Sequence, residues 1–214
     1  VEGFVVELPT AGGHNAPPRG KYLLSEKNEP IYSSRDEVNF QRIADLGLPF
    51  WIGGSYASPQ KLLDARALGA SGIQAGSIFA LCNKSGLDPL LTAEIRSQGF
   101  SGNLNIRTDV RASSTGFPIK VVDLDNTVSN SVVYQARKRI CNASYLVTVC
   151  RKKDGALFTR CSAEPVQKYV RKGGLAKDTE NVRCLCNGLL AASGLADPEE
   201  PPILTLGDDV GFLQ

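Results

Sequence analysis

Apolar runs alternate with amphipathic segments along the first hundred residues. The run FVVEL (4–8) is apolar and β-branched with one acid, LPFWIGG (48–54) is apolar and ends in paired glycines, and GIQAGS (72–77) is a third short run. Apolar character on successive positions, as in FVVEL, is typical of a strand buried on both faces of a parallel sheet. We therefore predict one strand in each run.

A helix is expected between the first two strands. Ser34 and Glu37 have the spacing of a capping box and precede apolar residues at helical spacing. Gly47 stands where such a helix would stop. The pattern predicts a helix of about three turns. Its apolar stripe consists of Val38, Phe40, Ile43 and Leu46.

Two later helices carry stronger start signals, because a capping side chain directly precedes a proline in each. Ser58-Pro59 begins one helix, which Gly69 ends, and Asp88-Pro89 begins the other. The inward face of the first of these helices is predicted to contain Leu62, Leu63 and Ala67.

Strands that alternate with helices through short connections predict right-handed βαβ units and an α/β fold with a parallel sheet. Only about three strands are visible, which is too few for an open doubly wound sheet or for a closed barrel of eight. The chain contains no methionine and opens at Val1 almost directly into a strand. We therefore expect it to be a piece of a longer protein.

From Gly99 onward the pattern changes to short strand-like runs, such as 119–124 and 145–149, between Gly, Asn and Asp turns. A boundary is predicted here. Residues 1–99 form the βα part, and residues 100–214 form a small, irregular C-terminal module that holds five of the six cysteines.

Composition and charge narrow the functional classes. A net charge of +2 is too small to favour nucleic acid, and the basic clusters 137–139 and 151–153 are interpreted as solvated surface. No apolar run approaches the roughly 20 residues that span a bilayer, so no membrane partner is expected. Six cysteines in 214 residues do not make a disulfide scaffold. A reduced, cytoplasmic environment is predicted.

Candidate chemistry follows each of the three predicted strands. Gly12-Gly13-His14 follows the first, Gly53-Gly54-Ser55 the second, and Gln74-Ala75-Gly76-Ser77 the third. Ligands of parallel α/β folds bind at the carboxyl ends of strands, where glycines let the backbone approach a phosphate. Either later loop alone is more simply a tight turn, but both together, one βα unit apart, favour a phosphate-binding site.

His14 is the only histidine in the chain. A lone histidine is more often a packed or surface residue than a catalytic one. An imidazole beside a phosphate site, however, can exchange a proton with a substrate near neutral pH. We therefore predict that His14 is a general base, and that Asn15 caps its turn. Asp208 and Asp209 are interpreted as surface residues.

The segments AGGHNAPPRG, FWIGGSYASPQKLLDARALGASGIQAGSIFA and CLCNGL resemble the nitronate monooxygenase family, formerly called 2-nitropropane dioxygenases, in particular a longer-tailed branch of it. Members of this family are FMN-dependent (β/α)8 TIM barrels. The resemblance implies that residues 1–99 are the C-terminal portion of such a barrel, with about three βα units, and that residues 100–214 are an extension.

The resemblance also assigns roles to the residues after each strand. His14 matches the base of the family's glycine-glycine-histidine loop. The cofactor-binding positions are Gly12, Gly13, Gly53, Gly54, Gln74, Ala75, Gly76 and Ser77. The sequence departs from the family at residues 50–52, where FWI replaces the usual small residues before the paired glycines.

The implied activity is oxidation of a small nitroalkane or nitronate with O2, FMN being the cofactor. An FMN-dependent enoyl-thioester reductase that uses a nicotinamide cofactor is an open alternative, because it carries a similar loop on the same fold. We expect the isolated chain to bind FMN weakly or not at all, since a partial barrel leaves sheet edges open.

A metal-stabilised binding or structural module is the alternative from another class. It would draw four thiolates from Cys141, Cys150, Cys161, Cys184 and Cys186. Only the last two are close in sequence, and they are separated by one residue, where structural zinc sites have about two to four. Small buried hydrophobic residues are the preferred interpretation of these cysteines.

Overall fold

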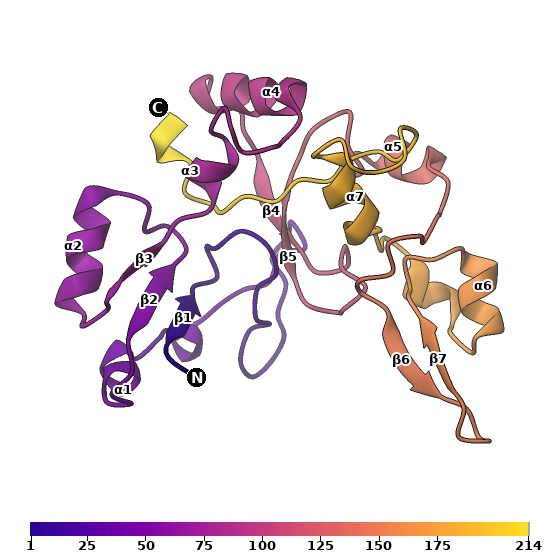
Figure 1. Cartoon of the computed structure of the whole chain (residues 1–214), viewed down its shortest axis with the longest axis horizontal. Helices are drawn as coiled ribbons and strands as arrows, with labels where there is room; N and C mark the ends of the chain where they lie inside the picture. The colour runs from indigo at the N-terminus through magenta and orange to yellow at the C-terminus, as the bar shows by residue number, and fades with distance from the viewer. Residues whose placement is uncertain (214) are drawn as a thin grey trace.

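The computed structural model describes residues 1–213. Its N-terminal part is a three-stranded parallel sheet of β1 (Phe4–Glu7), β2 (Phe50–Gly53) and β3 (Gly72–Gln74), ordered as in the sequence (Figure 1). The three predicted strands and their parallel arrangement are confirmed, and the chain is a mixed α/β protein. Among the described residues the strands form separate small sheets, and none closes into a barrel.

One face of the parallel sheet packs against helices, and the other face is exposed to solvent. Phe50 and Ile52 are buried on the packed face with Phe4 and Val6, against helices α1 (Phe40–Ala44) and α2 (Pro59–Ala67). The alternate residues point to the other face, where Val5 is 51% and Trp51 37% exposed. β1 is therefore not buried on both faces within this chain, which differs from the prediction made for residues 4–8.

The first predicted helix is wrong in length. The capping box lies one residue earlier, between Ser33 and Asp36, and opens only the 3-10 turn η1 (Ser34–Asp36). Glu37 then adopts an extended conformation, and Asn39 caps the short helix α1. A second capping residue inside the apolar stripe thus divides one expected helix into two pieces.

Helix α2 begins as predicted, with the Ser58 hydroxyl accepting a hydrogen bond from Lys61 N–H and proline in the first turn. Its predicted inward face is partly wrong, because Leu63 is 61% exposed and Ala67 is also exposed, whereas Ala65 is fully buried. Short α3 (Ser77–Ala80) follows β3. The predicted start of α4 (Pro89–Phe100) is confirmed, with Asp88 accepting from two backbone N–H groups.

Two antiparallel pairs and several short helices make up the C-terminal part. The pair β4–β5 lies at the centre of the molecule, and the β6–β7 hairpin projects from one end (Figure 1). The elements are β4 (Ile106–Asp109), β5 (Ile119–Val122), α5 (Ser131–Ala136), β6 (Thr148–Arg151), β7 (Leu157–Arg160), α6 (Val166–Arg171), η2 (Ala176–Thr179), α7 (Leu185–Ala191) and η3 (Gly211–Leu213).

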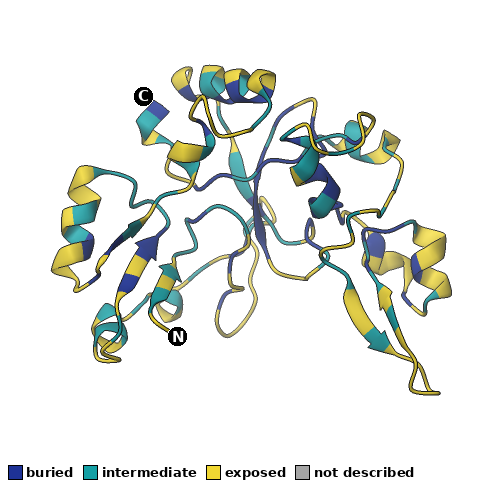
Figure 2. Ribbon diagram, in the orientation of Figure 1, coloured by how far each residue is buried: buried dark blue, intermediate teal, exposed yellow. Residues whose placement is uncertain are grey.

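All four residues of β5 are buried, and the strand appears as a continuous dark segment in Figure 2. Val122 packs with Leu91 and Ile95 of α4, while Ile119 and Val121 pack with Leu185 of α7 in a second cluster. The boundary predicted near Gly99 falls at the end of α4. Hydrophobic packing crosses this position, because α4 and β5 share one core.

The basic cluster at 137–139 differs from its interpretation as solvated surface. Arg137 and Arg139 are only partly exposed, and their guanidinium groups lie 5.2 and 5.9 Å from the centre of the Tyr134 ring. Only Lys138 extends into solvent, where it pairs with Glu199. Within residues 1–213 no helix has the length and apolar composition needed to cross a membrane.

Candidate functional site

The loops that follow the three parallel strands meet around one cavity of about 300 Å³. Seven of the eight predicted cofactor-binding residues line it: Gly12, Gly13, Gly54, Gln74, Ala75, Gly76 and Ser77. The sequence places them up to 65 residues apart, and the parallel register of β1, β2 and β3 brings them together at the carboxyl edge of the sheet.

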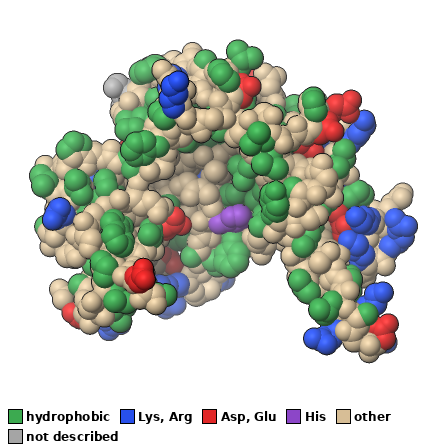
Figure 3. All heavy atoms as spheres, in the orientation of Figure 1, with side chains coloured by type: hydrophobic (Ala, Val, Ile, Leu, Met, Phe, Trp, Pro, Cys, Tyr) green, Lys and Arg blue, Asp and Glu red, His purple; other side chains and the backbone are tan. Residues whose placement is uncertain are grey.

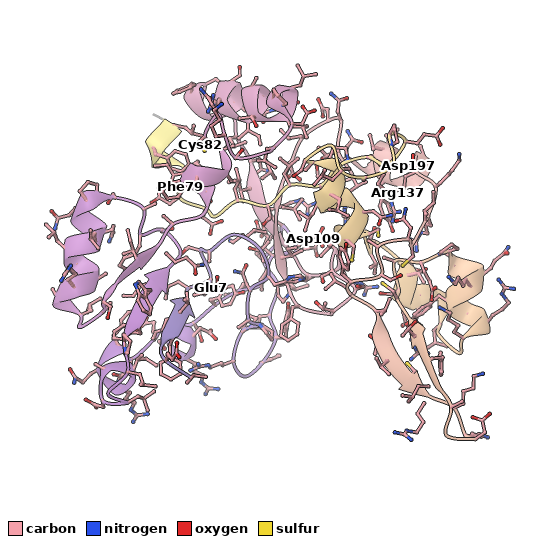
Figure 4. The ribbon with its side chains drawn as sticks, viewed as in Figure 1. Glu7, Phe79, Cys82, Asp109, Arg137 and Asp197 are labelled. Carbon is pink, nitrogen blue, oxygen red and sulfur yellow. The ribbon has the colours of Figure 1, made fainter. Side chains whose placement is uncertain are left out.

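Gly53 is the exception, because it does not line this cavity. It lies in β2 between Glu7 and Gln74, which are its register partners on the neighbouring strands. Gln74 Nε2 donates to Glu7 Oε1 across this strand at 3.0 Å, and a Cβ at Gly53 would lie at an ordinary contact distance of 3.6 Å from both side chains. Figure 4 labels Glu7 at the sheet beside the centre of the molecule.

Glycine is required at two places in the wall. Gly54 has a φ of +96°, and a Cβ there would lie 2.8 Å from Thr10 Oγ1. A Cβ on Gly12 would lie 2.9 Å from the backbone nitrogen of Gly207. These contacts show how closely the backbone segments approach one another. At Gly76, in contrast, a Cβ would meet nothing within 4 Å, so open space lies beside this backbone.

A segment near the C-terminus, which the sequence did not point to, supplies the remaining wall through Thr205, Leu206 and Gly207. Thr205 Oγ1 accepts a hydrogen bond from Gly13 N–H at 2.6 Å. Gly207 N–H donates to Ser77 Oγ at 2.8 Å. No local sequence motif predicts this part of the wall, because Thr205 and Gly207 each form a hydrogen bond with a residue more than a hundred positions away.

The polar groups around the cavity include hydrogen-bond donors of the kind that bind an anion. Thr10 Oγ1 is buried in the wall and has no hydrogen-bond partner among the described residues. Since Ser77 Oγ accepts from Gly207, its own proton remains free to donate to an anion. These donors are neutral: the charged residues in the described lining are Glu7 and Asp209, with no lysine or arginine.

His14 lies beside this cavity and lines a second one of about 220 Å³, which shares Glu7 with the first. Its ring reaches the surface, in the hollow that Figure 3 shows between the two parts of the molecule. Nε2 lies 2.7 Å from Ser113 Oγ, which in turn lies 2.7 Å from Thr115 Oγ1. Surrounding protein lowers the pKa of His14 from 6.5 by desolvation, so the ring is neutral at pH 7.

The position of His14 depends on β5. Gly13 C=O accepts from Lys120 N–H at 2.9 Å, and Asn15 N–H donates to Pro118 C=O at 2.8 Å. The loop is therefore held as a short antiparallel bridge beside Ile119. The side chain of Asn15 donates to Ala11 C=O at 3.1 Å, which confirms its predicted role in the turn.

Tyr32 is a second titratable group beside His14 that the sequence analysis did not single out. Its hydroxyl donates to Ala16 C=O at 2.9 Å. Burial, with smaller effects of Tyr22, Asp36 and Asp208, raises the pKa of Tyr32 to about 12. Tyr32 therefore remains a neutral hydrogen-bond donor at physiological pH.

The thiol alternative receives no support from the geometry. Within residues 1–213 no group of three or more His, Cys, Asp or Glu side chains is arranged to hold a metal ion. Cys161 and Cys184 pack in a small hydrophobic cluster with Ala163 and Val182. Burial raises the pKa of Cys184 to about 11, which favours the thiol over the metal-ligating thiolate.

Comparison with protein-family models and with curated proteins found no match to this chain.

The unpartnered hydroxyl of Thr10 leads to a stability prediction. A buried hydroxyl without a partner costs about 1 to 3 kcal/mol. We expect Thr10→Val, which keeps the shape of the side chain, to raise the free energy of unfolding by about 1 kcal/mol in chemical denaturation. Thr92→Val is the matched control, because the Thr92 hydroxyl donates to Asp88 C=O. That variant should instead lose stability, and a loss of stability in Thr10→Val would show that its hydroxyl is already satisfied.

Because His14 is the only histidine, its proton signal can be assigned in the NMR spectrum without mutagenesis. We expect the ring to titrate with a pKa below 6.5 in the folded chain, since desolvation disfavours the charged form. The same chain in urea should titrate near 6.5. A folded-state pKa at or above the value in urea would contradict the partly desolvated position of the ring.

Proposed function

We propose that this chain is part of an FMN-dependent oxidoreductase that resembles the nitronate monooxygenases, with the cavity between the strand-end loops holding the FMN phosphate. The observation that supports this most is the convergence of three glycine-containing loops on one cavity with an unpartnered buried hydroxyl. The single histidine follows directly in one of these loops.

Each part of the cavity would have a defined role. Gly76 allows the backbone to approach the phosphate, whereas Gly12 and Gly54 allow neighbouring backbone segments to pack closely in the wall of the cavity. The hydroxyls of Thr10 and Ser77 donate to the phosphate oxygens. When bound, FMN supplies the electron acceptor and the reaction with O2. The protein contributes the position of the cofactor, the neutral donor set and the base.

His14 is proposed as the base that removes the acidic α-proton of a small nitroalkane. With Nε2–H donating to Ser113 Oγ, Nδ1 keeps its lone pair and can accept that proton. The Ser113 proton then points to Thr115 Oγ1, which completes a consistent direction of donation. A ring that is neutral at pH 7 has the protonation state that a base needs.

We also propose that the parallel sheet is the C-terminal portion of a (β/α)8 barrel. The outer edges of β1 and β3 pair with no other strand in residues 1–213, and the exposed sheet face carries Val5 and Trp51. Neighbouring barrel strands would cover both edges. The six free cysteines agree with the reducing environment of the cytoplasm.

An NMR titration of the chain with FMN tests the proposed phosphate site, and it detects affinities into the millimolar range. We expect amide shifts at Gly12, Gly54 and Gly76, and competition by inorganic phosphate. Ser77→Ala should weaken binding by about tenfold, the loss of one charge-assisted hydrogen bond. Ser71→Ala, exposed at the opposite end of β3, should bind like wild type. Absence of shifts at these glycines both in this chain and in the complete barrel enzyme would reject the site.

Replacing His14 with Asn separates proton removal from cofactor binding. In the complete barrel enzyme, turnover of a neutral nitroalkane should fall by about 100-fold or more, the usual contribution of a general base. Turnover of the preformed nitronate, which has already lost its proton, should fall much less. FMN affinity should stay unchanged, because His14 lines the neighbouring cavity. Equal turnover of the neutral nitroalkane by the variant and the wild type would refute the assignment.

A further inference from the structure

Residues 203–209, here called the C-terminal strap, cross the molecule from α7 back towards α3 (Figure 1). Val122 N–H of β5 donates to Leu204 C=O at 3.0 Å, so the strap first runs beside the central strand. Leu204 and Leu206 are buried in the core that α4 and β5 share. The strap then leaves β5 and reaches the cavity assigned above to the FMN phosphate.

At the cavity the strap forms one hydrogen bond with each of three separate polar groups of the site. Thr205 Oγ1 accepts from Gly13 N–H, and Gly207 N–H donates to Ser77 Oγ. Asp208 N–H donates to Thr10 C=O at 3.0 Å. The strap thus contacts both hydroxyl-bearing residues and the glycine loop that are proposed to surround the phosphate.

An ion pair fixes the end of the strap. Lys120 Nζ lies 2.7 Å from Asp208 Oδ2, and the lysine side chain is only 6% exposed. Asp208 is exposed, as expected from the sequence, but its carboxylate is held by this buried lysine. Lys120 belongs to β5, and its backbone N–H donates to Gly13 C=O. The same lysine therefore holds the loop before His14 through its backbone and the strap through its side chain.

We propose that the C-terminal strap is part of the cofactor site, in which Thr205 and Gly207 are positioning residues. Binding of the phosphate is coupled to the hydrogen bonds that hold the strap against the cavity. Thr205 orients the Gly12-Gly13 backbone, and Gly207 directs the Ser77 hydroxyl proton towards the ligand. This inference rests on the proposed function. A strap that served only to fill the core would keep Leu204 and Leu206 buried with or without a ligand.

Coupling between two sites is reciprocal, so it can be measured from either side. From the ligand side, FMN should slow hydrogen exchange of the Gly207 and Asp208 amides, the two strap donors at the site. From the strap side, Thr205→Val should weaken FMN binding in the NMR titration by about tenfold, within the usual range of such coupling. Thr205→Ser keeps the hydroxyl and should restore the affinity.

Lys120→Met provides a second test that keeps the volume of the buried side chain. We expect faster exchange of the strap amides and weaker FMN binding. Lys138→Met is the matched control, because Lys138 pairs with Glu199 at 2.8 Å but both side chains are 74% exposed. This control should leave both measurements at the wild-type values.

The possible outcomes distinguish failure of the proposed function from failure of the proposed role of the strap. If neither this chain nor the complete barrel enzyme binds FMN or inorganic phosphate, the proposed function fails and this inference fails with it. Wild type could bind FMN while folded Thr205→Val binds it equally well and the hydrogen-exchange rates of the strap amides are the same with and without FMN. In that case only the role of the strap is rejected. Weakened binding in Thr205→Val with rescue by Thr205→Ser, together with slowed strap exchange, supports it.

Discussion

The backbone hydrogen bonds along the two edges of β5 are the constraint on which the rest of this structure depends. One edge pairs with β4, and the other is shared by the loop before His14 and by Leu204. A buried backbone group without a partner is costly, so a fully buried strand requires partners on both edges. β5 can therefore be buried only if segments from both ends of the sequence lie beside it.

This arrangement explains why the candidate site includes residues from both parts of the chain. The parallel sheet brings the glycine loops together, but β5 sets the position of His14 through Gly13 and Asn15. The hydroxyl beside the imidazole comes from Ser113, in the turn that precedes β5. A division at Gly99 describes the change in sequence pattern, whereas the packing of α4 against β5 crosses it.

The sequence correctly predicted those features that depend on interactions between neighbouring residues, such as the starts of helices. Ser58-Pro59 and Asp88-Pro89 begin helices because the cap and the proline act within one turn. The glycine loops were found because the parallel order of strands places their ends at one edge. Thr205 and Asp208 could not be found in this way, since their partners are Gly13 and Lys120, far away in the sequence. The exposure of Leu63 was also missed, because helical periodicity indicates an apolar face but not whether a neighbour covers it.

The absence of cationic side chains from the described lining of the first cavity has a consequence for how its ligand is selected. A phosphate held by lysine or arginine gains long-range attraction, which added salt screens over about 10 Å. Here the nearby charges are the carboxylates of Glu7 and Asp209, and the donors are hydroxyl and backbone groups. Recognition would therefore depend on shape and short hydrogen bonds, and raising the ionic strength would screen repulsion rather than attraction.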